Sequence, residues 1–285
     1  MRTRAPYIAC LAVVASLVPA LAIAGAWLPA RGEYYSEISA AREFADTYYD
    51  KLGTRYPFPL SVRREQRRLT FYNELGWKKS VSVQLGIPLV SETLNAPDFR
   101  YSSTETGFGD VQVGFRFKLH DGRTALALQS DYIAPAGYQT RTSPTLGGNA
   151  AVAEQQLLYG TGLKSWNMIV EAGLGYRSYF VGRRSELTGA LTVSRWIGSS
   201  LLVSGHCYSL QTLAATKDSP EDFRYNRVGP ELRYRVDDRL DVFVGSDHLA
   251  SGRNVDHPDT YYAGVAYRQS KRDRLQGLLG NKTRP

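Results

Sequence analysis

Cysteine is scarce in this sequence. Only Cys10 and Cys207 occur among its 285 residues. Cys10 lies in an amino-terminal segment that we expect to be removed. The one remaining cysteine cannot form an intramolecular disulfide, which excludes a small scaffold held together by disulfides.

Long apolar runs are also lacking after the first 24 residues. A transmembrane helix needs about 20 consecutive apolar residues. The mean hydropathy of −0.32 is that of a soluble protein. Half of each strand of a membrane β-barrel is polar, so these values also fit such a barrel.

Three motifs of enzymes and cofactor-binding proteins are absent, namely GxxxxGK[ST], HExxH and CxxC. A phosphate-binding loop, a zinc protease site and a redox dithiol therefore have no support. We predict no cofactor and no metal. An export signal also argues against nucleic acid as a partner, despite the formal net charge of +8.

That export signal occupies residues 1–24. Two arginines precede an apolar run over residues 7–18, Pro19 ends the run, and small residues then offer a cleavage site after Ala24. The run is too short to span a bilayer, so an uncleaved anchor is the weaker alternative. We therefore expect a cleaved signal peptide over 1–24, a folded domain over 25–269 and a carboxy-terminal tail over 270–285.

The segment over residues 106–119 reads TGFGDVQVGFRFKL and alternates strictly between apolar and polar side chains. This period predicts a β-strand with one apolar and one polar face. The apolar face carries Val111, Val113, Phe115, Phe117 and Leu119, and the opposite face carries Asp110, Gln112, Gly114, Arg116 and Lys118.

The same alternation recurs along the chain and predicts about twelve strands. Several exceed ten residues, as tilted membrane strands do, whereas soluble strands average about five to six residues. The expected ranges are 33–44, 64–76, 80–91, 106–119, 123–136, 150–164, 167–180, 185–198, 200–213, 223–237, 240–250 and 258–269.

The connections between these strands alternate in length. Short turns are expected at 77–80, 120–123, 164–167, 198–200 and 237–239, and longer polar connections at 45–63, 92–105, 137–149, 214–222 and 251–257. The connection at 181–184 is the exception, because it falls where an external loop is expected and yet is short. Outer-membrane barrels have short periplasmic turns and longer external loops. The sequence therefore predicts an all-β, transmembrane antiparallel β-barrel of about twelve strands in the outer membrane of a Gram-negative bacterium. Ten or fourteen strands and a soluble β-sandwich are the alternatives.

In such a barrel the apolar row of each strand faces lipid and the charged row faces the lumen. Opposed charges, such as Glu171 with Arg177 or Glu154 with Lys164, could cross-link a narrow lumen. The four tryptophans lie near strand ends, where an interfacial belt is expected. The candidates for lining the lumen are Arg68, Glu74, Arg116, Lys118, Asp131, Glu154, Lys164, Glu171, Arg177, Glu231, Arg233 and Arg235.

The tail over 270–285 carries five basic residues and one acidic residue. We expect a disordered periplasmic extension. Contact with anionic lipid or an acidic partner is the alternative.

Three segments resemble a known family. These are Gly107-Phe108-Gly109-Asp110, the preceding Gly86-Ile87-Pro88-Leu89, and the run from Asp131 to Gly137 that reads DYIAPAG. The start of the mature chain, Gly25-Ala26-Trp27-Leu28-Pro29, is similar as well. They resemble the outer-membrane proteins of the phenol degradation meta-pathway family, which is related to outer-membrane transporters of fatty acids and aromatic hydrocarbons. The resemblance implies a porin-like barrel for transport of small, hydrophobic compounds, and it implies no catalytic residues.

Two other functions stay open. An outer-membrane lipid hydrolase, of the phospholipase or lipid A deacylase type, needs a His base within reach of a Ser hydroxyl. His248 and Ser251 are the first candidates, although a spacing of three places them on opposite faces of a regular strand. Ser204 and His206 have the right spacing, but a polar pair lining the lumen or a set of cross-strand partners is the favoured explanation for them.

The other alternative is a structural or adhesive barrel that acts through its external loops, chiefly 45–63 and 92–105. His257 with Asp256 and Asp259 is a weak candidate for a cation site. The partners we expect are outer-membrane lipid, the barrel assembly machinery and a small hydrophobic ligand.

Overall fold

The computed structural model describes residues 25–138, 144–180, 184–213 and 222–269. The predicted signal peptide and the predicted tail lie outside these residues, as do parts of three predicted connections. Within them no helix is long and apolar enough to cross a membrane.

Nearly all of the described chain is β-strand. Three short 3-10 helices, η1 (Pro59–Ser61), η2 (Pro97–Phe99) and η3 (Lys164–Trp166), lie in connections. The strands are β1 (Tyr34–Tyr49), β2 (Arg55–Pro57), β3 (Arg63–Lys78), β4 (Val81–Ala96), β5 (Tyr101–Phe108), β6 (Asp110–His120), β7 (Thr124–Pro135), β8 (Val152–Leu163), β9 (Met168–Tyr179), β10 (Glu186–Ile197), β11 (Leu201–Thr212), β12 (Arg224–Arg235), β13 (Leu240–Arg253) and β14 (Val255–Arg268).

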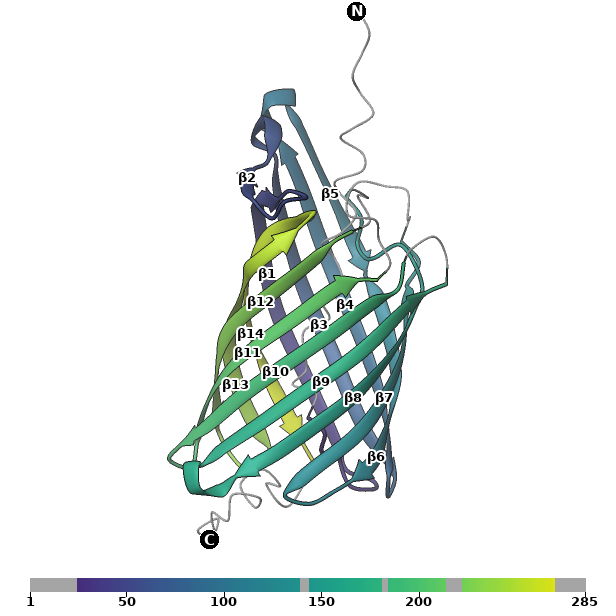
Figure 1. The fold of residues 1–285 in the computed structure, drawn as a ribbon, viewed down its shortest axis with the longest axis vertical. Coiled ribbons are helices and arrows are strands. Elements are labelled where there is room, and N and C mark those ends of the chain that lie inside the picture. Colours follow the sequence, from purple (N-terminus) through teal and green to yellow (C-terminus); the bar gives the residue numbers. More distant parts are fainter. Residues whose placement is uncertain (1–24, 139–143, 181–183, 214–221, 270–285) are drawn as a thin grey trace, which may run out of the picture.

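These strands close into one antiparallel barrel with twelve strands around its wall (Figure 1). β5 and β6 both pair with β4 and form the two halves of one wall strand, interrupted at Gly109, while β2 pairs only with the end of β1. β14 pairs with β1 along its length, from Tyr35 opposite Arg268 to Tyr49 opposite Val255. The predicted all-β barrel of about twelve strands is confirmed.

The two rims of the barrel differ. All five predicted short turns lie at one rim, which we call the turn rim and which is the lower one in Figure 1. The opposite loop rim carries the longer connections. By analogy with outer-membrane barrels, the turn rim is the periplasmic end.

Two of the predicted long connections are wrong. Residues 92–105 form mostly a hairpin of β4 and β5 around η2, and residues 251–257 belong to β13 and β14 apart from Asn254, whose φ of 49° reverses the chain. Polar strands pair beyond the membrane as well as within it. The hydroxyl of Thr93 bonds that of Thr104 at 3.0 Å, and Thr106 donates to Ser91 at 2.9 Å. Polar composition therefore did not mark a loop here.

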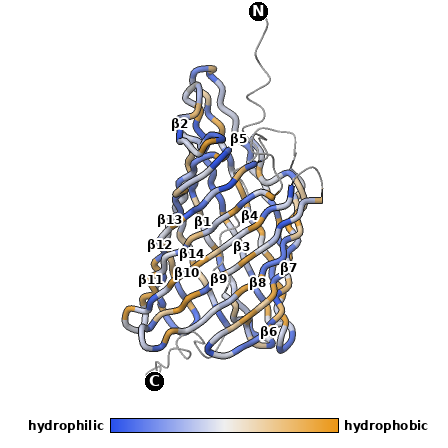
Figure 2. The backbone as a smooth tube through the Cα atoms, in the orientation of Figure 1, coloured by the Kyte–Doolittle hydropathy of each residue, from blue (hydrophilic) through white to orange (hydrophobic). Residues whose placement is uncertain are grey.

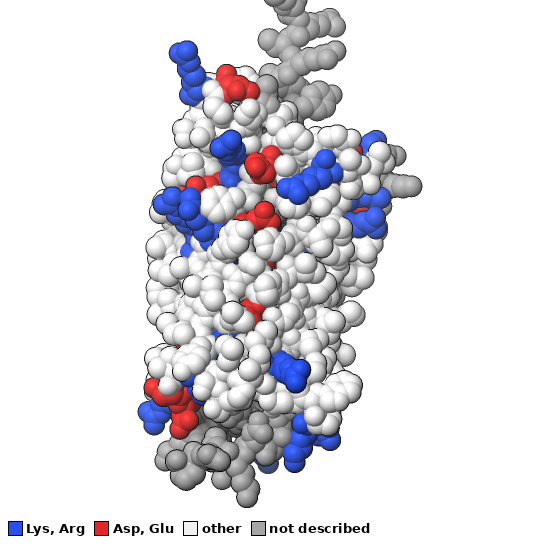
Figure 3. Space-filling model, turned by 90° about the vertical axis from the view of Figure 1, so that its left-hand side faces the viewer, with Lys and Arg blue, Asp and Glu red and all other residues white. Residues whose placement is uncertain are grey.

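The outer wall is apolar and the interior is polar. Along β6 the side chains of Val113, Phe115, Phe117 and Leu119 are exposed, whereas Arg116 is buried. The alternation of apolar and polar residues along neighbouring strands is visible in Figure 2. Figure 3 shows charged side chains gathered mostly above and below a broad white band. This distribution is that of a barrel whose outer face contacts hydrocarbon.

The predicted tryptophan belt is half wrong. Trp77 and Trp166 are exposed near the turn rim, as expected. Trp196 is buried, since it occupies an inward position of β10, and the guanidinium of Arg235 lies 4.3 Å from the centre of its ring. Trp27 packs inside the barrel. Position near a strand end did not distinguish the two faces.

Candidate functional site

The barrel interior is the candidate site, because its inward positions hold a network of buried ion pairs. The guanidinium of Arg177 lies 2.9 Å from a carboxylate oxygen of Glu154 and 3.6 Å from one of Glu186. All three side chains are almost fully buried. Both carboxylates lie on strands next to that of Arg177, since Glu154 of β8 and Glu186 of β10 each lie opposite Arg177 of β9.

Further pairs follow the same pattern. Arg64 of β3 lies 2.5 Å from Glu92 of β4 and 3.3 Å from Asp256 of β14. Arg233 lies 3.1 Å from Glu231 and 3.6 Å from Glu37. Burial of an unpaired charge is costly, so these arginines and carboxylates stabilise each other only as pairs.

Arg116 lies in the half of the lumen on the side of the turn rim. It lies 3.3 Å from Glu74 and donates to the side-chain oxygen of Gln129 at 2.8 and 3.0 Å. Its Nη1 also donates to the backbone oxygen of Gly25 at 2.9 Å. Arg116 therefore ties the start of the described chain to the barrel wall.

The segment over residues 25–30, which we call the inner segment, occupies this part of the lumen. Ala26 and Leu28 are fully buried and form a cluster with Ala125, Ala127 and Leu158 of the wall. Trp27 packs against the same cluster and donates its indole N–H to the backbone of Gly122 at 3.1 Å. The inner segment thus lies inside the lumen and packs against its wall.

The inner segment fits closely at Gly25. A Cβ atom at that position would lie 2.6 Å from the carboxylate of Glu171 on the facing wall. Only glycine avoids this clash without a shift of the glutamate side chain.

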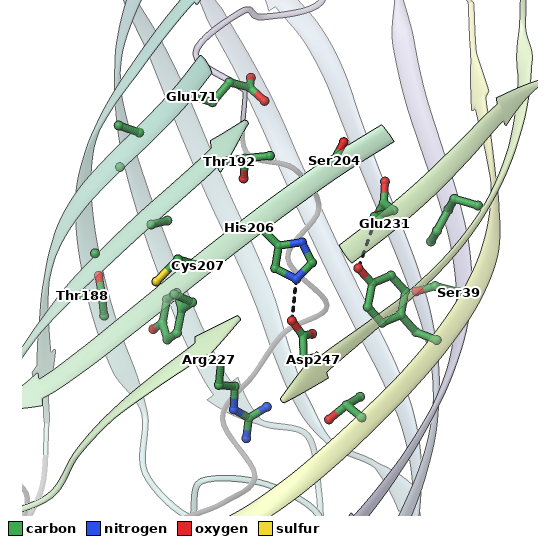
Figure 4. Close-up of a pocket in the computed structure, with 18 of the residues that line it drawn as sticks. Ser39, Glu171, Thr188, Thr192, Ser204, His206, Cys207, Arg227, Glu231 and Asp247 are labelled. Carbon is green, nitrogen blue, oxygen red and sulfur yellow. Dashed lines mark hydrogen bonds and ion pairs between the residues drawn. The ribbon is translucent and has the colours of Figure 1, made fainter. Parts of the chain in front are cut away.

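Toward the loop rim from the inner segment, the lumen holds a cavity lined by both apolar and polar side chains (Figure 4). The apolar lining residues include Leu158, Ala190, Tyr208 and Phe243. The polar ones include His206 and Asp247, which form a hydrogen bond of 2.5 Å between Nε2 and Oδ1. Tyr262 donates to Glu231 at 3.4 Å beside it. The cavity can hold a molecule with an apolar body and few polar groups.

Most of the predicted lumen-lining residues lie inside the barrel. Eight are buried, namely Glu74, Arg116, Asp131, Glu154, Glu171, Arg177, Glu231 and Arg233. Arg68, Lys118 and Arg235 are partly buried. Which of them border a path for a solute stays a prediction.

Lys164 is the exception. It lies in η3 at the turn rim and is exposed, because the strand ends at Leu163 before its alternation reaches the lysine. The suggested pair of Glu154 with Lys164 is therefore wrong. The suggested pair of Glu171 with Arg177 is wrong as well, because Arg177 pairs with Glu154. Lys118, also near this rim, lies 2.6 Å from Asp121 of the adjacent turn.

The structure does not bring His248 and Ser251 together. His248 Nδ1 lies 2.8 Å from Asp259, and its Nε2 lies 3.2 Å from the hydroxyl of Ser246. Ser251 instead accepts a hydrogen bond from Asn226 at 2.8 Å. The second pair also lacks a catalytic contact, since Ser204 bonds Ser194 at 2.9 Å while His206 bonds Asp247.

The suggested cation site is not assembled either. Asp256 lies beside Arg64, Asp259 lies beside His248, and the ring of His257 packs on Tyr49 at 5.4 Å between centroids. The described residues contain no group of three or more potential metal ligands.

Several interior residues were missed by the sequence reasoning. Glu37 and Glu43 of β1 are buried and approach Arg233 and Arg227 at 3.6 Å each. Their signal was present, because both fall on the same period-two face as the buried Ser39. The seating of the inner segment had no such signal, since a contact between chain segments distant in sequence leaves no period.

The sequence and the fold were compared with those of known proteins. The model of the family described as "Putative MetA-pathway of phenol degradation" matches residues 66–270. A search of curated proteins finds no match.

Among solved structures, the COG4313 outer membrane channel from Pseudomonas putida F1 is similar with a TM-score of 0.67 at 12% identity, over 85% of this chain and 97% of that chain. The NanC porin has a TM-score of 0.51 at 10% identity, over 81% and 98% of the two chains. The translocator domain of the autotransporter NalP from Neisseria meningitidis has 0.50 at 8% identity, over 84% and 89%. At these identities the likeness shows a shared outer-membrane barrel fold. The three structures are a channel, a porin and a translocator domain rather than enzymes.

Proposed function

Since the chain belongs to the family described as "Putative MetA-pathway of phenol degradation", we propose that it is an outer-membrane channel for small, hydrophobic compounds. The fold supports this proposal through its apolar belt and closed wall, which are those of an outer-membrane barrel. The similar structure from Pseudomonas putida F1 is described as an outer membrane channel.

The observation that carries the proposal is the cavity in the lumen. Leu158, Tyr208 and Phe243 contribute apolar surface to its lining, in an interior that also carries many buried charges. A purely hydrophilic pore has no need of such apolar surface. Apolar surface attracts an apolar solute out of water at roughly 25 cal/mol per Å² buried, so the cavity is a favourable stop along the lumen.

The inner segment affects how such a compound passes from the cavity to the periplasmic end of the lumen. It occupies part of the lumen between the cavity and the turn rim, where Ala26 and Leu28 pack against the wall. A solute that leaves at the periplasmic end must therefore displace the inner segment or pass beside it. We expect a channel of low conductance, and not a wide water-filled pore.

The proposal is tested by uptake of the apolar fluorescent probe N-phenyl-1-naphthylamine into cells with and without the protein. Ala190→Phe places a ring at an inward position of β10 that borders the cavity. Leu191→Phe is the matched control, since the adjacent Leu191 faces outward and is exposed. Uptake should rise with the wild type and the control and fall toward background with Ala190→Phe. Equal uptake with all three, or none above background, would overturn the proposal.

We also propose that the chain is not an enzyme. The separation of His248 from Ser251, each with another hydrogen-bond partner, supports this. Outer-membrane lipid and the barrel assembly machinery remain the partners we propose for a barrel of this kind. The adhesive alternative remains a prediction.

A further inference from the structure

On the outer wall of the barrel, the outward side chains of β1 and β14 are small at one level. Ala40 and Ala263 face each other across these strands and are both exposed on the outer face. Leu69 and Leu89 follow on β3 and β4, and Val244 follows on β13. Together these residues border a depression on the outer surface, which we call the alanine groove.

The alanine groove is bounded by bulky side chains toward the turn rim and by polar side chains toward the loop rim. Toward the turn rim, the next outward row is bulky, with Ile38 between Val265 and Phe71. Toward the loop rim, the next outward row is polar and contains Arg42 and Arg67. An occupant of the groove therefore contacts alanine and leucine at one end and arginine at the other.

The two arginines lie directly opposite each other on β1 and β3. Like charges in such a cross-strand pair destabilise a sheet. Both donate their Nε–H to the same oxygen of Glu65, at 2.9 Å in each case. Their side chains are still 54% and 68% exposed, and one carboxylate leaves one positive charge in excess.

This arginine pair stands at the edge of the apolar belt. Along its ladder row the neighbours are Tyr261 on one side and Ser91 and Thr106 on the other. The next outward row toward the turn rim, with Ala40, Leu69 and Leu89, is apolar on the same strands. A change from apolar to polar at one level on adjacent strands marks the membrane interface, and at the loop rim that is the outer leaflet. Lipid phosphates lie at this depth.

From this arrangement we propose that the alanine groove and the arginine pair bind one phosphate-bearing lipid of the outer leaflet. An acyl chain lies on Ala40 and Ala263, between the leucines and Val244. The lipid phosphate accepts hydrogen bonds from Arg42 and Arg67, whose planar guanidinium groups match phosphate geometry. The phosphate also removes the repulsion between the two cations.

A free phosphate ion fits this site less well than a lipid does. It would use the arginines alone and leave the apolar groove beneath them without an occupant. The geometry therefore favours a molecule that joins a phosphate to a hydrocarbon chain. This inference needs only the barrel in its membrane, so it stands or falls independently of transport.

The test is lipid binding by the full-length protein in detergent, measured by native mass spectrometry during titration with purified lipid A. One variant combines Arg42→Gln with Arg67→Gln, and a second, Ala263→Leu, fills the groove without a change of charge. Arg224→Gln is the matched control, because Arg224 is an exposed arginine at the loop-rim end of β12. A heat-dependent shift on gels verifies that each barrel is folded.

We expect the double variant and Ala263→Leu each to weaken lipid A binding by about tenfold, with the control unchanged. Lipid A from which the phosphates have been removed should bind the wild type as weakly as lipid A binds the double variant. Equal binding by the wild type and the double variant would overturn the proposal. Unchanged binding by Ala263→Leu, together with competition by inorganic phosphate, would reduce the site to a simple anion site and would also overturn it.

Discussion

Arg116 donates a hydrogen bond of 2.9 Å to the backbone oxygen of Gly25, across 91 residues of sequence. The same guanidinium lies beside Glu74 and Gln129, so one buried side chain joins three wall strands to the inner segment. This contact places the beginning of the described chain inside the lumen. Because the inner segment lies in the lumen, a change in it should alter the conductance of the barrel.

Removal of residues 25–30 should raise the conductance of the barrel. The inner segment occupies part of the lumen, where Ala26 and Leu28 pack against the wall, whereas the wall strands are paired without it. Protein produced without residues 1–30 and refolded in detergent is compared in planar bilayers with protein that begins at Gly25. We expect a several-fold larger unitary conductance. A folded barrel with unchanged conductance would mean that the inner segment does not limit the passage of ions.

Arg177→Met should destabilise the barrel strongly. The change leaves the carboxylates of Glu154 and Glu186 buried without the cation between them. Loss of one member of a buried ion pair costs roughly 3–5 kcal/mol. Urea unfolding of protein refolded into phospholipid measures this free energy. Arg195→Met is the control, because Arg195 is exposed on the outer face of β10; a comparable loss in both variants would argue against a special role of the buried pair.

The wall of the barrel could be predicted from sequence because its signal is local. In the strand over 106–119, the period of two assigned Phe115 outward and Arg116 inward without knowledge of any partner. The same rule held around the barrel, since each strand buries one face only. It failed at Lys164, where the strand ends one residue too early.

The contents of the lumen depended on contacts that no local pattern records. Glu171 lies on the same strand as Arg177, about 20 Å along β9, so it could not pair with it. The partner is instead set by the register between β8 and β9, which places Glu154 opposite Arg177. Likewise, nothing in Gly25-Ala26-Trp27-Leu28 shows which wall strands it will meet. A period of two assigns a face to a side chain, whereas a partner is assigned only by the closed barrel.

Incubation of the purified protein with phospholipid or lipid A should release no fatty acid. His248 is held by Asp259 and Ser246, and the hydroxyl of Ser251 is held by Asn226. Any trace of release should therefore be the same for the wild type, His248→Ala and Ser251→Ala. Thin-layer chromatography of the lipid products tests this. A release that disappears in both variants would restore the hydrolase alternative.

Gly229→Ala should impair folding, while Gly205→Ala should not. A Cβ at Gly229 would lie 1.7 Å from the backbone oxygen of Ser246 and 3.0 Å from His206 Nε2. The ladder between β12 and β13 already lacks pairs here, between Val228 opposite His248 and Glu231 opposite Gly245. The backbone of Ser246 must move to admit the methyl group, and that movement separates the strands further.

Gly205 lies one strand away on β11, and a Cβ there meets nothing within 4 Å. The two substitutions therefore add the same methyl group in one region of the wall with opposite steric consequences. The folded fraction after refolding, taken from the heat-dependent shift on gels, should fall for Gly229→Ala and equal that of the wild type for Gly205→Ala. Equal folding of both variants would show that β12 and β13 can separate at Pro230 at little cost, which would make this part of the wall the weakest in the barrel.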